Sequence, residues 1–367
     1  MGMMRILKNI LLCICIVFFV SGCSDFNTSN VNLSGICFSA VKASTASAYY
    51  LSKEGTLYCK GADIDASAYV KYQDEKNGIV AYNVKSFGEI YRGGYYINNS
   101  NDLYLWNTEE LPLLNYNTSK AHAKILENVK FVRFGNDCVI FIDISDNMYL
   151  IGDFHGETYS VNAPKFIANN VKWADIRGKA VVWTDYSGKF DFYGETQVFS
   201  NDDLIDLKNQ ISESWVEQIE IHDHFILLVK DNDLWFYGDY KRFMSEHHGR
   251  NDDFVLEFLP LKENVEVFSA SSTVIMALDF AGEAFVWGEC VSNGYDNPDD
   301  TLFKYYEEYR IANNVKNIYT SGACICYVDV NGSSHIFHAG GWPDFYGNSV
   351  DAENVGLERE PNTWIKE

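Results

Sequence analysis

The segment Asn147-Met-Tyr-Leu-Ile-Gly152 is one of seven related stretches in this chain of 367 residues. Their last residues lie 46, 45, 42, 44, 50 and 50 positions apart, and self-similarity at such a period is typical of a repeat architecture. The repeat therefore decides the fold class. The other six stretches are Gly55-Thr-Leu-Tyr-Cys-Lys-Gly61, Asp102-Leu-Tyr-Leu-Trp-Asn107, Gly188-Lys-Phe-Asp-Phe-Tyr-Gly194, Asp233-Leu-Trp-Phe-Tyr-Gly238, Gly282-Glu-Ala-Phe-Val-Trp-Gly288 and Gly332-Ser-Ser-His-Ile-Phe-His338.

An apolar residue lies 22 positions before the penultimate residue of each stretch. In the third repeat this interval holds the extended runs 129–134, 138–143 and 148–151, which are separated by turn residues. We expect these runs to be three antiparallel strands. Apolar segments that return later in most repeats, such as 124–126, predict a fourth strand. The seven apolar residues are Phe38, Val84, Val129, Val171, Trp215, Val265 and Val315.

Asn residues at positions 83, 128, 170, 264 and 314 precede this apolar residue, and Asn suits the turn or left-handed conformation expected at a crossing between repeats. Four short antiparallel strands per repeat, seven times over, predict an all-β fold: a seven-bladed β-propeller over residues 36–367 with repeats of about 42–50 residues. Only neighbouring blades cover both apolar faces of one blade. We therefore expect aromatic side chains such as Trp106, Tyr193 and Trp287 to lie between blades.

The sixth repeat is the most informative about family. It reads Asn264-Val-Glu-Val-Phe-Ser-Ala-Ser-Ser272, then Ile275-Met-Ala-Leu-Asp279, then Phe285-Val-Trp-Gly288. This order resembles the repeats of the regulator of chromosome condensation 1 (RCC1) family, over about residues 36–345. The resemblance implies a seven-bladed propeller, and some propellers of this family inhibit enzymes. The family's usual His in the second strand and its Gly-Gln-Leu-Gly motif are absent, so the nuclear exchange activity of the founding protein is not carried over.

Residues 1–22 have the features of a secretory signal, with Arg5 and Lys8 before an apolar run and small residues before Cys23. The run is shorter than the roughly 20 apolar residues that span a bilayer. Val20-Ser-Gly-Cys23 resembles a bacterial lipobox, which implies that Cys23 is lipidated. An ordinary cleaved signal is the alternative. Residues 23–35 are then a polar tether, and the protein is expected on the extracytoplasmic side of a bacterial cell membrane.

The formal net charge of −22 repels phosphate backbones and anionic lipid headgroups, which argues against a nucleic-acid partner and favours a basic or neutral one. Six cysteines follow residue 23, and an even number of cysteines outside the cytoplasm permits disulfides. Most of them lie in apolar strand patterns, so we favour buried thiols. The six cysteines are Cys37, Cys59, Cys138, Cys290, Cys324 and Cys326.

The longest connections between repeats run from Asp239 to Glu263 and from Glu289 to Asn313. Insertions in a repeat fold gather on one face and often build its binding surface, and aromatic residues with Arg are typical interface anchors. We expect a protein partner to bind this loop face. Solvated loops without a ligand are the alternative. The residues expected to contact the partner are Tyr240, Arg242, Phe243, His247, Arg250, Tyr295, Tyr305 and Tyr306.

No strong signal for catalysis or metal binding is present. His222-Asp-His224 places two imidazoles on one side of a strand, but no further ligands follow at a spacing typical of zinc. The acidic runs 201–203 and 296–300 lack the Gly and Glu of an EF-hand loop. We expect neither cofactor nor enzyme activity. The alternative is a carbohydrate-binding or carbohydrate-active propeller that uses the mouth of the central channel, since glycosidases need only two suitably spaced carboxylates.

Overall fold

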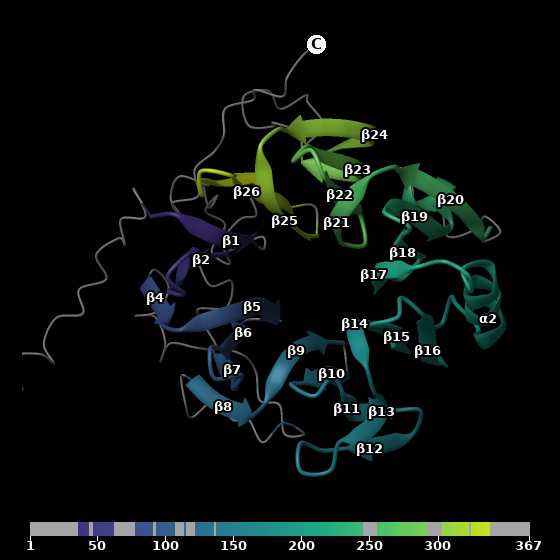
Figure 1. Ribbon diagram of the computed structural model, residues 1–367, viewed down its shortest axis with the longest axis horizontal. Coiled ribbons are helices and arrows are strands. Elements are labelled where there is room, and N and C mark those ends of the chain that lie inside the picture. The colour runs from purple at the N-terminus through teal and green to yellow at the C-terminus, as the bar shows by residue number, and fades with distance from the viewer. Residues whose placement is uncertain are drawn as a thin grey trace, which may run out of the picture.

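The computed structural model describes residues 36–43, 47–61, 78–90, 93–106, 114, 122–135, 137–244, 255–291, 303–322 and 324–337. Their strands form seven antiparallel sheets around one axis (Figure 1). The fold is a seven-bladed β-propeller, which confirms the prediction from the repeats. Within the described ranges, no helix is both long enough and apolar enough to cross a membrane.

Each blade takes its strands in chain order, from the axis outwards (Figure 1). Blade one consists of β1 (Phe38–Ala43), β2 (Ser47–Ser52), β3 (Leu57–Gly61) and β4 (Gly78–Ala81). Blade two consists of β5 (Val84–Ile90), β6 (Gly93–Asn98), β7 (Leu103–Trp106) and β8 (His122–Leu126). Blade three consists of β9 (Val129–Phe134), β10 (Cys138–Asp143), β11 (Met148–Phe154) and β13 (Lys165–Ala168), with the short β12 (Glu157–Tyr159) beside β11.

The remaining blades follow the same plan, with three strands described in blades four and seven. Blade four consists of β14 (Val171–Arg177), β15 (Lys179–Asp185) and β16 (Phe190–Glu195). Blade five consists of β17 (Val216–Ile221), β18 (Phe225–Lys230), β19 (Asp233–Gly238) and β20 (Glu257–Lys262). Blade six consists of β21 (Val265–Ala270), β22 (Val274–Asp279), β23 (Ala284–Val291) and β24 (Phe303–Ala312), and blade seven of β25 (Val315–Ser321), β26 (Cys324–Asp329) and β27 (Ser334–Phe337).

Asn residues mark the crossings between blades, as predicted. Each inner strand then has a register shift near its start, which is typical of a β-bulge. Because of this shift, the first and fourth residues of the strand are both buried. The crossing residues with a backbone φ between 58° and 60°, in the left-handed region that Asn tolerates, are Asn83, Asn128, Asn170, Asn264 and Asn314.

Blade five departs from the spacing of 22 residues. Its inner strand begins at Val216, so Trp215 is the crossing residue, and its side chain is 44% exposed. The expectation that Trp215 starts the strand was wrong by one position. The reason is the hairpin between β18 and β19, whose turn residues Asp231 and Asn232 have φ values of 54° and 68°. This two-residue turn makes the hairpin one residue shorter than that of blade three.

The same backbone hydrogen bond joins each blade to the next. The first residue of each inner strand donates its N–H to the carbonyl of a positive-φ residue in the hairpin turn of the preceding blade, at 2.7–2.9 Å. This bond also joins blade seven to blade one, so the ring is closed. The donor and acceptor pairs are Val84 and Gly55, Val129 and Asn101, Val171 and Asp146, Val216 and Gly188, Val265 and Asn232, Val315 and Gly282, and Phe38 and Gly332.

Apolar packing between blades forms the core. At the closing junction, Phe38 and Val41 pack in one buried cluster with Val328 of blade seven. Trp106 and Trp287 are 3% and 2% exposed, which confirms their predicted burial. Tyr193 was also expected to lie between blades. Its ring stacks on that of Phe154 of blade three, with centroids 5.2 Å apart.

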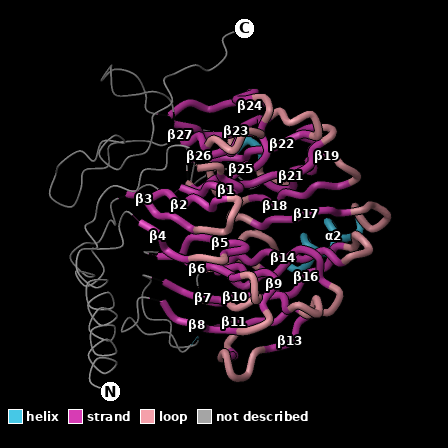
Figure 2. The backbone as a smooth tube through the Cα atoms, turned by 60° about the vertical axis from the view of Figure 1, so that its left-hand side comes forward, coloured by secondary structure: helices cyan, strands magenta, loops and turns pink. Residues whose placement is uncertain are grey.

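Helix α2 (Asn201–Gln210) takes the outer position in blade four, where a complete blade has its fourth strand (Figures 1 and 2). A capping box starts it, because Ser200 Oγ accepts a hydrogen bond from the Asp203 N–H and the Asp203 carboxylate accepts one from the Ser200 N–H. Leu207 is fully buried and anchors the helix on the junction of blades four and five.

Three of the predicted thiols, those of Cys138, Cys324 and Cys326, are buried and outside any disulfide. The preference for buried thiols is confirmed for these three. Burial raises the pKa of the Cys138 thiol to about 11. Cys37 is an exposed thiol at the closing junction, and the side chains of Cys59 and Cys290 lie outside the described residues.

Candidate functional site

The long connection of blade five begins with a short helix, α3 (Tyr240–Phe243). Asp239 caps this helix, because its Oδ1 accepts a hydrogen bond from the Arg242 N–H at 3.0 Å. Phe243 is 3% exposed and packs on Phe236, with ring centroids 5.7 Å apart. Phe243 was expected to contact a partner at the surface, but its ring lies in the core because the helix turns it inward.

The other predicted contact residues fall in several places. Tyr240 and Arg242 are half-buried at the surface. Tyr305 and Tyr306 lie in β24, where their backbone pairs with Glu289 and Gly288, so they are strand residues and not loop residues as predicted. The remaining three lie outside the described residues, namely His247, Arg250 and Tyr295.

Tyr240 lines a groove of about 410 Å³ between blades five and six, which we call the β20–β24 groove. The outer strand of blade five forms one side, and the outer strand of blade six forms the other. The groove thus combines one predicted contact residue with several that the sequence analysis did not single out. Its lining residues are Tyr240, Leu259, Pro260, Leu261, Trp287, Glu307 and Glu308.

The rim of the β20–β24 groove is acidic. Glu307 and Glu308 are both exposed, and Lys262 Nζ of β20 binds Glu308 Oε1 at 2.8 Å. Burial raises the pKa of the Tyr240 hydroxyl, and the two neighbouring carboxylates add to this shift. Aromatic and apolar walls below carboxylates suit an extended segment that carries apolar and cationic side chains.

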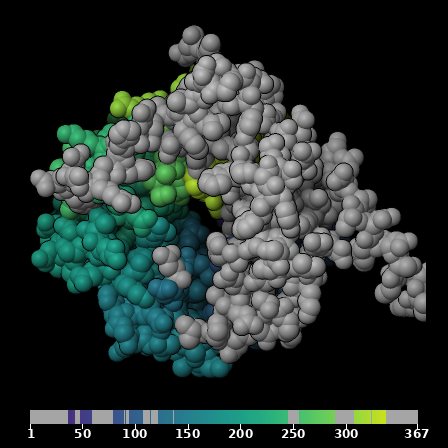
Figure 3. All heavy atoms as spheres, turned by 180° about the vertical axis from the view of Figure 1, so that it is seen from behind, coloured from purple at the N-terminus to yellow at the C-terminus, as the bar shows by residue number. Residues whose placement is uncertain are grey.

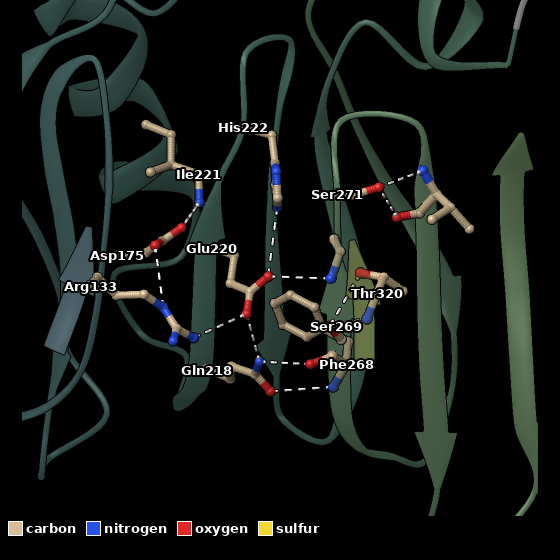
Figure 4. Close-up of polar contacts among 12 residues, drawn as sticks. Arg133, Asp175, Gln218, Glu220, Ile221, His222, Phe268, Ser269, Ser271 and Thr320 are labelled. Atoms are coloured by element: carbon tan, nitrogen blue, oxygen red, sulfur yellow. Dashed lines mark hydrogen bonds and ion pairs between the residues drawn. The ribbon is translucent and has the colours of Figure 1, made fainter. Parts of the chain in front are cut away.

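A second polar cluster lies on the inner strands, around the axis of the ring (Figure 4). Arg133 of β9 lies 3.6 Å from Asp175 of β14 and 3.7 Å from Glu220 of β17. Gln218 Nε2 donates to the carbonyl of Phe268 at 2.9 Å, which extends the cluster to blade six. The view from behind shows the molecule hollowed near the centre of this ring (Figure 3).

The carboxylates of this cluster are already engaged by the protein. Asp175 accepts a hydrogen bond from the Ile221 N–H at 2.8 Å, and Glu220 accepts one from the Ala270 N–H at 3.3 Å. Burial raises the pKa of Asp175 to about 6, against the opposing effect of Arg133. These contacts favour a link between blades over an open pair of catalytic carboxylates. The sequence holds one signal for this cluster. Arg133, Asp175 and Glu220 are each the fifth residue of an inner strand.

The segments considered for metal binding contact other protein groups or lie outside the described residues. His222 Nε2 lies 3.6 Å from Glu220 Oε2, at the inner cluster. Among the residues that the structure describes, no group of three or more His, Cys, Asp and Glu side chains is placed to hold a metal ion. Asp203 belongs to the capping box of α2, and the run 296–300 lies outside the described residues.

Comparison with known proteins agrees with the fold. No family model matches the chain, and no curated protein matches its sequence. Prp20p from Saccharomyces cerevisiae matches with a TM-score of 0.55 at 14% identity, over 77% of this chain and 80% of that chain. Human WBSCR16 matches with a TM-score of 0.53 at 12% identity, over 76% and 84% of the two chains. Yeast RCC1 (Prp20) bound to Kap60 matches with a TM-score of 0.53 at 15% identity, over 77% and 78%. The structural neighbours therefore include RCC1-like β-propellers.

Proposed function

We propose that this protein is a lipid-anchored, extracytoplasmic binding module that holds a protein partner in the β20–β24 groove. The β20–β24 groove carries the proposal, because it joins half-buried Tyr240 to an acidic rim at the connections that the sequence singles out. The yeast neighbour Prp20p is described with binding to Gsp1p and histones and with Kap60 bound, which supports a protein as the ligand class. The net charge of −22 favours a basic or neutral partner.

The groove is tested by photo-crosslinking and then by affinity. A photoreactive residue at exposed Pro260, in cells that produce the full chain, identifies the partner by mass spectrometry. With the purified partner, Glu307→Lys should weaken binding about ten-fold, because it reverses charge at the rim. Glu195→Lys on blade four makes the same charge change at an exposed site and should leave affinity within about two-fold. The absence of any protein crosslinked at position 260, or equal affinity of wild type and both variants for the crosslinked partner, would eliminate the groove.

The anchor is tested by metabolic labelling with a fatty acid. Wild type and Cys37→Ala should carry the label and fractionate with membranes, whereas Cys23→Ala should carry none, because only Cys23 follows the lipobox-like residues. A labelled Cys23→Ala protein that stays in the membrane would contradict lipidation at this residue.

The alternative of glycan binding or hydrolysis at the mouth of the central channel gives a different result. It requires binding on a glycan array or turnover in a hydrolysis screen, and neither should depend on Glu307.

A further inference from the structure

Large hydrophobic side chains are exposed at repeated positions on one face of the ring. Consecutive antiparallel strands bring the turns between second and third strands, and the crossings between blades, to the same face, which we call the turn face. In blades three, four, six and seven, the exposed residue directly follows the Asp that begins this turn. The exposed large hydrophobic residues of the turn face are Tyr82, Ile144, Tyr186, Trp215, Phe280 and Val330.

The turn geometry explains this exposure. In blade six, Asp279 Oδ1 accepts hydrogen bonds from the N–H groups of Ala281 and Glu283 at 2.9 and 2.8 Å. The N–H of Phe280 donates to the carbonyl of the crossing residue Asn264 at 3.2 Å. The backbone of Phe280 is thus fixed while its ring is 61% exposed. A rigidly presented aromatic ring loses little conformational entropy on binding.

At blades five and six, the exposed rings lie among carboxylates that the protein does not neutralise. Glu213, Glu263 and Glu266 are exposed, and within the described ranges no hydrogen bond or ion pair holds their side chains. Glu263 and Glu266 flank the crossing from blade five to blade six, and Glu213 lies two residues before Trp215. In this part of the turn face, exposed aromatic rings therefore occur together with carboxylates that have no ion pair among the described residues.

Backbone contacts make this part of the face continuous. Asp231 Oδ1 accepts a hydrogen bond from the Trp215 N–H at 3.0 Å. The next residue of the same turn accepts the N–H of Val265 at 2.7 Å, and the residue before Val265 accepts the N–H of Phe280 at 3.2 Å. The path therefore runs from Trp215 to Phe280 across the junction of the two blades.

Two lysines of blades three and four form ion pairs within the protein at the turn face. Lys130 Nζ binds Asp146 at 2.5 Å and also contacts the hydroxyl of Tyr186. Lys172 Nζ of blade four binds Glu217 of blade five at 2.7 Å and lies over the Trp215 ring, 5.8 Å from its centroid. Within the described ranges, Glu213, Glu263 and Glu266 have no such ion pair, so negative charge at the junction of blades five and six is left uncompensated.

We infer that the turn-face patch of Trp215, Phe280, Glu213, Glu263 and Glu266 binds a basic segment of a second protein. Lys and Arg side chains pair with the carboxylates and lie against the exposed indole and phenyl rings. The same charge repels nucleic acids and anionic lipid surfaces. The patch lies on the turn face, apart from the β20–β24 groove, and the inference does not depend on the function proposed for that groove.

The charge requirement is tested with a labelled peptide of Lys, Arg and Leu, and with its counterpart in which Glu replaces each basic residue. Binding to the full chain is measured by fluorescence anisotropy at about 150 mM salt, which screens long-range attraction. Wild type should bind the basic peptide and not the acidic one. Glu263→Lys with Glu266→Lys should weaken binding about ten-fold. Glu54→Lys with Glu127→Lys makes the same change in net charge on the turn face of other blades and should have less than about a two-fold effect.

The aromatic requirement has its own matched pair. Trp215→Ala with Phe280→Ala should weaken binding about five-fold, whereas Tyr186→Ala should leave it unchanged. All these side chains are exposed, and thermal unfolding checks that each variant is folded. Equal losses in the two charge-reversal proteins would show non-specific attraction and overturn the inference. Full binding by the variant lacking both aromatic rings would overturn it as well.

Discussion

At the scale of single residues, the glycines in the second half of the third strands are fixed by close backbone contact. A Cβ atom on Gly152 (φ 120°) would lie 2.3 Å from the carbonyl oxygen of Asp137, and one on Gly238 would lie 2.4 Å from that of His224. Gly178 also has a positive φ, 57°, but a Cβ atom there would have no neighbour within 4 Å. A side chain at Gly152 would therefore clash with the backbone, whereas one at Gly178 would meet only the strain of a left-handed backbone conformation.

Gly152→Ala should therefore lower the free energy of unfolding by about 3 kcal/mol or more, whereas Gly178→Ala should cost about 1 kcal/mol from left-handed strain alone. Urea titration of the two variants measures the difference. Equal midpoints would show that the close approach at Gly152 is relieved without cost.

Asp175 gives the fold a pH dependence of known sign. Its folded pKa is raised from 3.8 to about 6 by burial, so the folded state binds this proton more tightly than the unfolded state. Its contribution to stability is present at low pH and is lost as the pH rises through about 6. Compared with Asp175→Asn, wild type should gain about 1 kcal/mol between pH 7 and pH 5. Parallel stability curves for the two proteins over this range would refute the shift.

At the scale of elements, α2 replaces an outer strand by burying one face on the blade junction. Leu207→Ala should cost about 2–5 kcal/mol, because it leaves a cavity under the helix. Ile205 on the same helix is 47% exposed, and Ile205→Ala should cost less than about 0.5 kcal/mol. Chemical denaturation of both variants measures this contrast. Similar losses would mean that the helix does not dock through its Leu face.

The strands were predictable because their alternation and their turn residues are local signals. The Asn crossings were predictable for the same reason, since a left-handed backbone position restricts residue type directly. Helix α2 was missed, although Ser200 and Asp203 form a readable capping signal, because the acidic run 201–203 was weighed only as a calcium loop. The prediction at Trp215 was wrong by one position because the turn between β18 and β19 is one residue shorter. The constant spacing of 22 residues assumed equal turns in all blades.

The candidate site was less predictable than the fold because it depends on tertiary contacts. The sequence identified the long connections, yet it did not show that α3 buries Phe243 or that β24 extends over Tyr305 and Tyr306. The inner cluster joins Arg133, Asp175 and Glu220 from three blades, and only the ring geometry brings them together.

At the scale of the whole molecule, seven equivalent backbone hydrogen bonds between blades form a repeated scaffold, and the surfaces outside them differ from blade to blade. The hairpin that contains Met148 and its six counterparts hold the ring together through the turn carbonyls that precede them. The β20–β24 groove and the turn-face patch lie outside these contacts. Substitutions in either surface should therefore change binding without opening the ring.

The closed ring is the central claim, and hydrogen exchange at the closing junction tests it most directly. The Phe38 N–H donates to the Gly332 carbonyl at 2.9 Å, as the Val171 N–H donates to that of Asp146 within the ring. The two amides should exchange at rates within about ten-fold of each other in the folded protein. Exchange of the Phe38 amide at the rate of an unprotected peptide, with Val171 still protected, would contradict ring closure.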